Sequence, residues 1–485
     1  MDSSKGGSSP TVLISNPAPF MTQPYLLKIL TQGKYLNASI TVNTINQISS
    51  SVYITFANES DADKFLSQFN EKSFEPTLDI KLKLTKAELN VKNEEPKTKK
   101  MTFIVDYPNL INTVYTVSEK EPGLVLTDKD FIDRQNRAVK WLLHKISSSI
   151  WKGQSIMNIS LPVYIFDKRT MLQVFAYELR ESPYYLSRAY HTKNTIERLK
   201  WMTAFLLCQI YVSPLRTKPF NPIIGETFQT KIGNMNVYCE QTVNKPPTAN
   251  FYCLDDERTY KFYGYIGTTA STGANSCRAH KEGKVYVEFK DGAKYRIYYP
   301  DVWLSGIMMG NSIFNYKHCA LIVDEVNKFA SYVKFNPTEK GFFKKMFSSK
   351  KQVTSPDSFA GNIYELKDIT IDKDGSKHSI HNKKPTSYGV IEGRWTNEVI
   401  IDGVTFWTRN ENKLLDMFEM EFKLPSDSTN RKDLQLFIEG KEEESQAEKE
   451  RVEEIQRKDR KLREENSKSV KKEENKKEKS HKGDK

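Results

Sequence analysis

The sequence of 485 residues contains no run of about 18 or more apolar residues and only five cysteines. A membrane-spanning helix needs such a run, so we expect no helix of this chain to cross a membrane. The cysteines are odd in number and lack the spacing of metal ligands, which is typical of reduced thiols. The first ten residues are rich in Ser and Gly and contain no apolar targeting segment. These absences predict a cytoplasmic protein.

Motifs that mark catalytic and cofactor sites are also missing. The sequence has no nucleophile elbow, no Gly-rich phosphate-binding loop and no cluster of metal ligands, and its 7 histidines are dispersed. We therefore expect neither an enzyme nor a bound cofactor or metal.

The formal net charge of +12 favours acidic partners, either anionic membrane surfaces or nucleic acid. Lys and Glu alternate in about the last forty residues, which carry +4 of this net charge. A solvated basic tail is the alternative interpretation, and the net charge alone does not decide between the two. We predict that residues 465–485 are disordered, because so polar a segment has little apolar surface to bury.

Residues 1–10 are expected to be disordered and residues 11–84 to form a small α/β domain. Strand-like alternation and helical spacing of apolar residues predict the order strand, helix, strand, strand, helix, strand. The clearest segments are strands at 11–15, 51–56 and 78–82 and helices at 24–30 and after a Ser60 cap. This ferredoxin-like order resembles the RNA-recognition motif.

RNA-recognition motifs stack bases on exposed aromatic residues of their two central strands. Only Tyr53 occupies such a position here, whereas Ser51 and Leu13 stand at the others, and Ser49 replaces the basic residue that opens the longer motif. Nucleic acid is therefore not expected as a partner. A protein-interaction domain, or a vestigial one, is favoured.

Residues 85–100 form a charged linker and residues 101–136 a connecting segment of no clear structure. Beyond it, Trp141, Leu142 and Ile146 lie at helical spacing and predict a short amphipathic helix. Two further helices are expected at 170–190 and 195–211.

The pattern changes to a period of two after residue 219. Short alternating runs follow one another, many of them separated by turns such as Asp291-Gly292. Such a series without intervening helices predicts a large antiparallel sheet that closes into a barrel, and a barrel of more than about ten strands encloses a cavity. The runs lie at 236–239, 250–253, 261–266, 284–290, 295–299, 320–323, 331–335, 390–395 and 404–408.

Residues 218–228 read Lys-Pro-Phe-Asn-Pro-Ile-Ile-Gly-Glu-Thr-Phe. The two prolines and the glycine predict a tight turn that presents Lys218 and Asn221 at a rim. A second block, residues 240–247, reads Glu-Gln-Thr-Val-Asn-Lys-Pro-Pro.

Both blocks resemble the signatures of the oxysterol-binding-protein-related lipid-transfer family. The first is similar to its Lys-Pro-Phe-Asn-Pro-x-x-Gly-Glu-Thr-Phe motif and the second to its Glu-Gln-Val-Ser-His-His-Pro-Pro, with Asn244 and Lys245 in place of the paired histidines. The resemblance covers residues 137–464. It implies an α+β chain whose barrel holds a lipid in an internal tunnel, covered by the helix of Trp141, Leu142 and Ile146 as a lid.

The C-terminal segment from residue 427 to beyond 461 reads as helix, and Lys449, Glu453 and Arg457 share one of its faces. By themselves these residues are typical of surface ion pairs. The resemblance implies instead that they hold a phosphoinositide headgroup at the tunnel mouth, together with Lys218, Asn221, Asn244 and Lys245. Lys245 keeps a positive charge and Asn244 a donor where the family has histidines.

A loop at 340–347 interleaves bulky apolar and basic side chains. Phe342, Phe343, Lys344 and Lys345 have the chemistry of a contact with an anionic membrane. Alternatively, the aromatic side chains hold this loop against the barrel.

The resemblance implies a lipid-transfer protein that associates peripherally with membranes. It would exchange a sterol or a phospholipid such as phosphatidylserine against phosphatidylinositol 4-phosphate. The alternative is a sensor or scaffold that reads lipid without transferring it and binds a protein through its N-terminal domain; an RNA-linked adaptor comes third.

Overall fold

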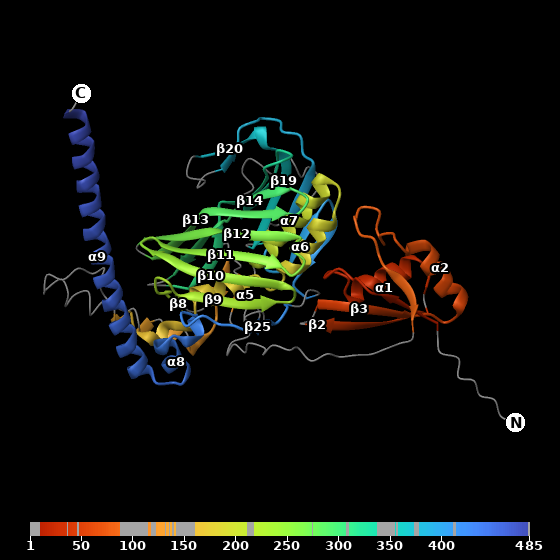
Figure 1. Ribbon diagram of the computed structural model, residues 1–485, viewed down its shortest axis with the longest axis horizontal. Helices are drawn as coiled ribbons and strands as arrows, with labels where there is room; N and C mark the ends of the chain where they lie inside the picture. The colour runs from red at the N-terminus through yellow and green to blue at the C-terminus, as the bar shows by residue number, and fades with distance from the viewer. Residues whose placement is uncertain are drawn as a thin grey trace.

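The structure is a computed structural model, and it describes residues 10–35, 37–45, 48–87, 115–117, 123–130, 132–134, 136–137, 140–141, 161–210, 218–273, 275–306, 310–336, 355, 357–372, 378–410 and 414–483. A small N-terminal domain lies beside a large barrel, and a long helix, α9, runs along the opposite side of the barrel (Figure 1). Within these ranges no helix is long and apolar enough to cross a membrane.

The N-terminal domain has the predicted order of elements. Its four-stranded sheet has the antiparallel order β2-β3-β1-β4. Val12, Ile14, Val52 and Ile54 alternate on the face that packs against the helices, as period-two burial requires. The elements are β1 Thr11–Ile14, α1 Gln23–Gln32, β2 Ser39–Ile45, β3 Ile48–Thr55, α2 Glu59–Phe69 and β4 Leu84–Ala87.

Two local predictions for this domain were wrong. The last strand is β4 rather than residues 78–82, so the domain extends to at least residue 87. Residues 78–82 alternate because Leu78, Ile80 and Leu82 are buried, but this segment lies outside the sheet and bridges to Thr192 of the barrel domain. Helix α2 begins after Asn58, whose side chain accepts the N–H of Asp61, and not after Ser60.

The predicted antiparallel barrel is confirmed. Every alternating run found in the sequence lies within or overlaps one of its strands, and the sheet closes on itself. In sequence order the strands are β5 Tyr115–Val117, β6 Leu124–Leu126, β9 Thr227–Ile232, β10 Met235–Asn244, β11 Pro247–Asp255, β12 Tyr260–Thr272, β13 Ser276–Phe289, β14 Lys294–Tyr298, β15 Asp301–Ser305, β16 Ile313–Lys317, β17 Cys319–Asp324, β18 Phe329–Phe335, β19 Ser358–Glu365, β22 Gly389–Arg394, β23 Glu398–Ile401, β24 Val404–Thr408 and β25 Met417–Glu419.

Strands β5 and β6 belong to the segment that the sequence left unassigned. They pair with each other, and β6 pairs with β16, so the barrel sheet begins upstream of residue 137. Strands of three residues carry too short an alternation to stand out in a sequence.

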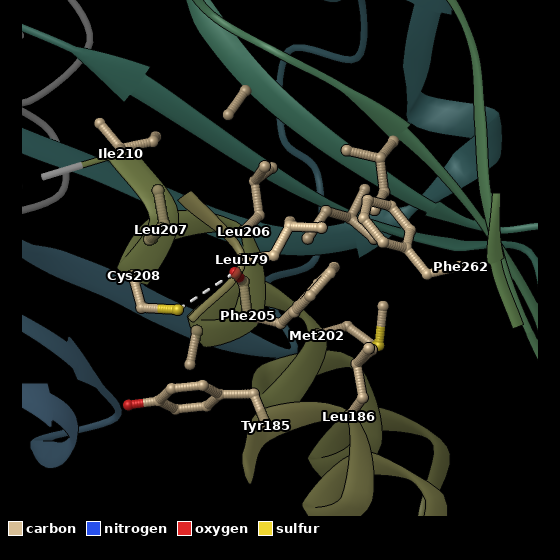
Figure 2. Packing of buried hydrophobic residues seen from close by; sticks show 14 of the residues in the cluster. Leu179, Tyr185, Leu186, Met202, Phe205, Leu206, Leu207, Cys208, Ile210 and Phe262 are labelled. Atoms are coloured by element: carbon tan, nitrogen blue, oxygen red, sulfur yellow. Dashed lines mark hydrogen bonds between the residues drawn. The ribbon is translucent and has the colours of Figure 1, made fainter. Parts of the chain in front are cut away.

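The helices between residues 171 and 210 pack against the barrel sheet. The single helix expected at 170–190 is two, α5 (Met171–Glu178) and α6 (Ser182–His191). Pro183, which lacks an N–H, stands in the first turn of α6, where that group is not needed. Helix α7 (Thr195–Ile210) is buried on almost every side in its second half, where Phe205 meets Phe262 of the barrel (Figure 2).

The C-terminal region also departs from the single helix expected. A short turn η6 (Ser428–Asn430), helix α8 (Lys432–Ile438) and helix α9 (Glu442–Gly483) follow one another. Gly440, in the left-handed conformation at φ +81°, separates the two helices. Helix α9 continues through most of the tail predicted to be disordered, because Lys and Glu favour helix and pair at i, i+4, as Lys461 and Glu465 do at 4.0 Å.

Candidate functional site

The rim loop, residues 218–226, is held at one end of the barrel. It starts with β8 (Lys218–Phe220), which pairs with β7 (Phe166–Thr170). The predicted tight turn is present: Gly225, at φ +81°, donates its N–H to the carbonyl of Gln241, whose own N–H bonds Glu226. Since Gln241 lies near the end of β10, this pairing places the rim loop next to the β10–β11 turn with Asn244 and Lys245.

Three of the predicted site residues meet at this rim. The Nζ atoms of Lys218 and Lys449 lie 5.5 and 5.1 Å from the ring centroid of Phe166. Lys449 is buried, and its ammonium donates to the Leu161 carbonyl at 3.0 Å and to Glu453 at 2.6 Å. The structure therefore brings Lys218, Lys449 and Glu453 together from segments more than two hundred residues apart.

This grouping changes the electrostatics of Lys218. Its side chain reaches solvent at the rim, but protein surrounds the ammonium closely enough that desolvation is the largest cause lowering its pKa. The nearby charge of Lys449 lowers that pKa further, and Glu453 opposes the shift. The site thus holds two cations close to one carboxylate, an arrangement that favours an added anion.

Within the part of the chain that the structure describes, no hydrogen bond or ion pair joins the other four predicted residues to this group. Arg457 is half-exposed, two turns along α9 from Lys449, and makes no hydrogen bond or ion pair within the described part of the chain. Asn221 makes its one hydrogen bond to the described residues through its backbone carbonyl, which accepts from Arg431. The side chains of Asn244 and Lys245 likewise have no partner among the described residues. All four offer donors to a ligand, and their roles stay predictions.

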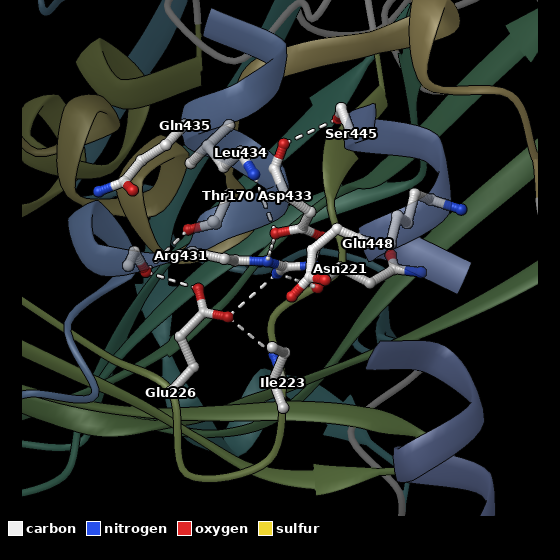
Figure 3. Close-up of polar contacts among 12 residues, drawn as sticks. Thr170, Asn221, Ile223, Glu226, Arg431, Asp433, Leu434, Gln435, Ser445 and Glu448 are labelled. Carbon is white, nitrogen blue, oxygen red and sulfur yellow. Dashed lines mark hydrogen bonds and ion pairs between the residues drawn. The ribbon is translucent and has the colours of Figure 1, made fainter. Parts of the chain in front are cut away.

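A buried polar cluster beneath the rim loop was missed in the sequence. Arg431 donates to Glu226 at 3.0 Å and, through two nitrogens, to Asp433 at 2.7 and 2.9 Å (Figure 3). Ser428 donates to the other oxygen of Glu226 at 2.6 Å, and Ile223 donates its N–H to Glu226 at 2.9 Å. Glu226 belongs to the recognised motif, but no local pattern indicates that its partner lies some two hundred residues later.

Other expectations fall on parts of the chain outside the described residues. Trp141 is helical and half-exposed, whereas Leu142 and Ile146 lie outside. The loop residues Phe342, Phe343, Lys344 and Lys345 lie outside as well. The lid, the membrane contact and the internal tunnel therefore stay predictions.

In the N-terminal domain, Tyr53 is only 9% exposed, so the aromatic position that the sequence retains is not open for base stacking.

Comparison with known proteins resolves the resemblance. A family model described as oxysterol-binding protein matches residues 145–485. The chain belongs to this family. Oxysterol-binding protein 9 of Dictyostelium discoideum is 30% identical over 372 residues, which cover 73% of this chain and 86% of that protein. Oxysterol-binding protein homolog 6 of Saccharomyces cerevisiae is 26% identical over 196 residues, or 38% of this chain and 44% of that one.

Among solved structures, the ORD domain of Osh1 in complex with cholesterol is similar, with a TM-score of 0.51 and 21% identity. The similarity covers 64% of this chain and 77% of the Osh1 domain. At this identity the likeness concerns the fold alone, and it agrees with the barrel derived from the alternating strands.

Proposed function

We propose that this oxysterol-binding protein binds a lipid in its barrel and transfers it between membranes in exchange for phosphatidylinositol 4-phosphate. The observation that carries the proposal is the pair of ammonium groups, Lys218 and Lys449, over the ring of Phe166 at the barrel rim. Membership of the family supports lipid binding as such.

A phosphoinositide headgroup suits these groups for electrostatic reasons. The charge of Lys449 lowers the pKa of Lys218, and a phosphate between the two ammonium groups replaces that repulsion with two charge-assisted hydrogen bonds. Glu453 accepts from Lys449 and so orients its ammonium, or accepts an inositol hydroxyl. Arg457 and Asn221 have donors left over for the remaining oxygens.

The two replaced histidines alter this site without removing its charge. Lys245 is exposed and brings a flexible ammonium, while Asn244 brings an amide donor. We therefore propose that headgroup binding is retained with a different affinity or preference among phosphoinositides. The helix of Trp141, Leu142 and Ile146 would close over the cargo, and the loop from Phe342 to Lys345 would touch the membrane.

The second lipid is a sterol or a phospholipid such as phosphatidylserine. Because the Osh1 domain of similar fold is described with cholesterol, sterol is the first cargo to test. An apolar cargo must be sealed from water during transfer, and a closed barrel with a lid provides that enclosure.

Transfer of phosphatidylinositol 4-phosphate between two liposome populations tests the proposal. The wild type, Lys218→Ala and the double variant Asn244→His/Lys245→His are compared, with Lys261→Ala as a control for loss of one exposed lysine elsewhere on the barrel. We expect transfer by the wild type and the control and a strong loss in Lys218→Ala. If only the histidine-restored protein transfers, the chain has given up this headgroup, and the sensor or scaffold function replaces the exchanger.

A further inference from the structure

The residues of the headgroup site come from two parts of the chain that are far apart in the sequence. Lys218 comes from the rim loop, whereas Lys449 and Glu453 come from α9. We propose that Arg431 is the positioning residue of this site: it clamps helices α8 and α9 to the rim loop and thereby sets the separation of Lys218 and Lys449. The assignment of a headgroup to the site rests on the proposed function, but the clamp, meaning the contacts of Arg431 with the rim loop and with Asp433, does not.

On the rim side, Arg431 binds the loop at three points. Its Nη1 atom donates to the carbonyl oxygen of Asn221 at 2.6 Å and to Glu226 at 3.0 Å. Its guanidinium carbon lies 5.3 Å from the ring centroid of Phe220. These contacts fix the backbone directly after Lys218, because Phe220 and Asn221 are two and three residues along.

On the helix side, Arg431 reaches α9 through Asp433. The carboxylate of Asp433 takes the Nε and Nη2 atoms of Arg431, and it also accepts the N–H of Leu434 at 2.9 Å. The backbone carbonyl of Asp433 accepts the hydroxyl of Ser445 at 2.7 Å. Ser445 is buried on α9 one turn before Lys449, so both residues lie on the helix face that meets the barrel.

A row of aromatic rings connects the clamp to the two lysines. The ring of Phe437, on α8, lies 5.9 Å from that of Phe220, which lies 5.0 Å from that of Phe166. The ammonium groups of Lys218 and Lys449 lie over the ring of Phe166. A shift of α8 relative to the rim loop would therefore move the ring on which both cations rest.

Stability alone does not account for a buried charged cluster at this place. The side chains of Arg431, Glu226 and Asp433 are 8%, 4% and 0% exposed. Apolar residues of similar volume often serve a fold as well as a buried ion pair does, since stripping water from charges is costly. A planar guanidinium with fixed donor directions instead sets geometry, and no lysine can hold Asp433, Glu226 and the Asn221 carbonyl at once in the same way.

The test compares Arg431→Met and Arg431→Lys with Arg188→Met. Arg188 is a matched control because it is also buried, also binds a carboxylate through short contacts, at 2.8 Å to both oxygens of Glu75, and lies on α6 at the N-terminal domain. In Figure 1, α6 stands on the opposite side of the barrel from α9. Loss of Arg188 thus removes a comparable ion pair without touching the rim loop.

The first readout needs no ligand. Competitive acylation of the full chain over a range of pH, followed by mass spectrometry, reports how readily Lys218 loses its proton. If Arg431→Met lets α9 move away, Lys218 loses both the burial and the charge of Lys449, so its pKa rises and its acylation at neutral pH falls. Arg431→Lys should give a smaller change in the same direction, and Arg188→Met none.

The second readout is binding to vesicles that contain phosphatidylinositol 4-phosphate, for which we expect affinity about tenfold weaker in Arg431→Met than in Arg188→Met. A folded Arg431→Met protein with the acylation profile of the wild type overturns the proposal, as does an equal change in Arg188→Met. Should Arg431→Met fail to fold, Arg431→Lys carries both readouts. If the wild type binds no phosphatidylinositol 4-phosphate, the proposed function fails while the acylation profiles still decide the role of Arg431.

Discussion

Lys218 and Lys449 place their ammonium groups over the same aromatic ring, that of Phe166, although they are separated by most of the barrel sequence. Cations are attracted to the face of an aromatic ring, and here one ring holds two of them. The two lysines are therefore concentrated at a single point of the rim, ready for an anion that binds both.

The lowered pKa of Lys218 predicts a pH dependence of headgroup binding. A phosphate favours the charged ammonium, so affinity for phosphatidylinositol 4-phosphate should be constant below that pKa and fall as the pH rises through it. Vesicle sedimentation between about pH 7 and pH 10 measures this fall. Lys218→Arg stays charged throughout this range, so its affinity should not fall with pH. A fall of the same size in that variant would show that another group titrates.

Lys449 should contribute more to binding than cations of α9 that lie outside the proposed site. Lys449→Ala removes a charge-assisted hydrogen bond to the ligand, and we expect affinity to fall about tenfold or more. Arg451→Ala is the matched control, because Arg451 is exposed and its only ion pair among the described residues is with Glu448 on the same helix. Its loss should change affinity by less than about twofold. Equal losses in calorimetric titrations of the two variants would argue against a specific site on this face.

The N-terminal domain should be coupled to the barrel through Arg188. This guanidinium binds both oxygens of Glu75 and lies about 5 Å from the rings of Phe20, Tyr25 and Trp201. Arg188→Met should lower the free energy of unfolding by about 2 kcal/mol, less than for a fully buried pair because Glu75 is partly exposed.

Urea unfolding followed by tryptophan fluorescence measures this loss, since Trp201 lies at the interface. Lys193→Met supplies the comparison: Lys193 pairs with Asp79 across the same interface, but both side chains are mostly exposed. We expect no measurable loss from that variant. If both variants unfold at the same urea concentration, the buried Arg188–Glu75 pair stabilises the fold no more than the exposed Lys193–Asp79 pair does.

Asp301 should make the barrel sensitive to acid. Burial alone would raise its pKa, but His318 and His280 donate to its two oxygens and bring that pKa to about 2. A carboxyl with a depressed pKa stabilises the fold at pH values above its unfolded pKa, and this contribution, about 2 kcal/mol, is lost as the pH falls from about 4 to 2. In thermal unfolding, Asp301→Asn should be less stable than the wild type above about pH 4, and its stability should fall less steeply between about pH 4 and pH 2.

How much the sequence could predict differs between elements for local reasons. The strands at 261–266 and 284–290 were found because their alternation is long, and the barrel follows from their number. The alternation at 78–82 led to a strand that does not exist, because Leu78, Ile80 and Leu82 point into the core of the N-terminal domain and burial there produces the same pattern as a sheet. The tail of α9 was missed because its composition suits both a disordered chain and an exposed helix.

The sequence alone determined the family, the barrel and the residue types at the rim, since motif, periodicity and charge are all written in neighbouring residues. It also determined that Lys449, Glu453 and Arg457 share one face of a helix, because helical spacing is local. Only the tertiary structure decided that Lys218 meets Lys449 over Phe166 and that Arg431 joins Glu226 to Asp433. Those contacts depend on how elements that are distant in the sequence pack together, and the spacing of residues along the chain does not give the distances between such elements.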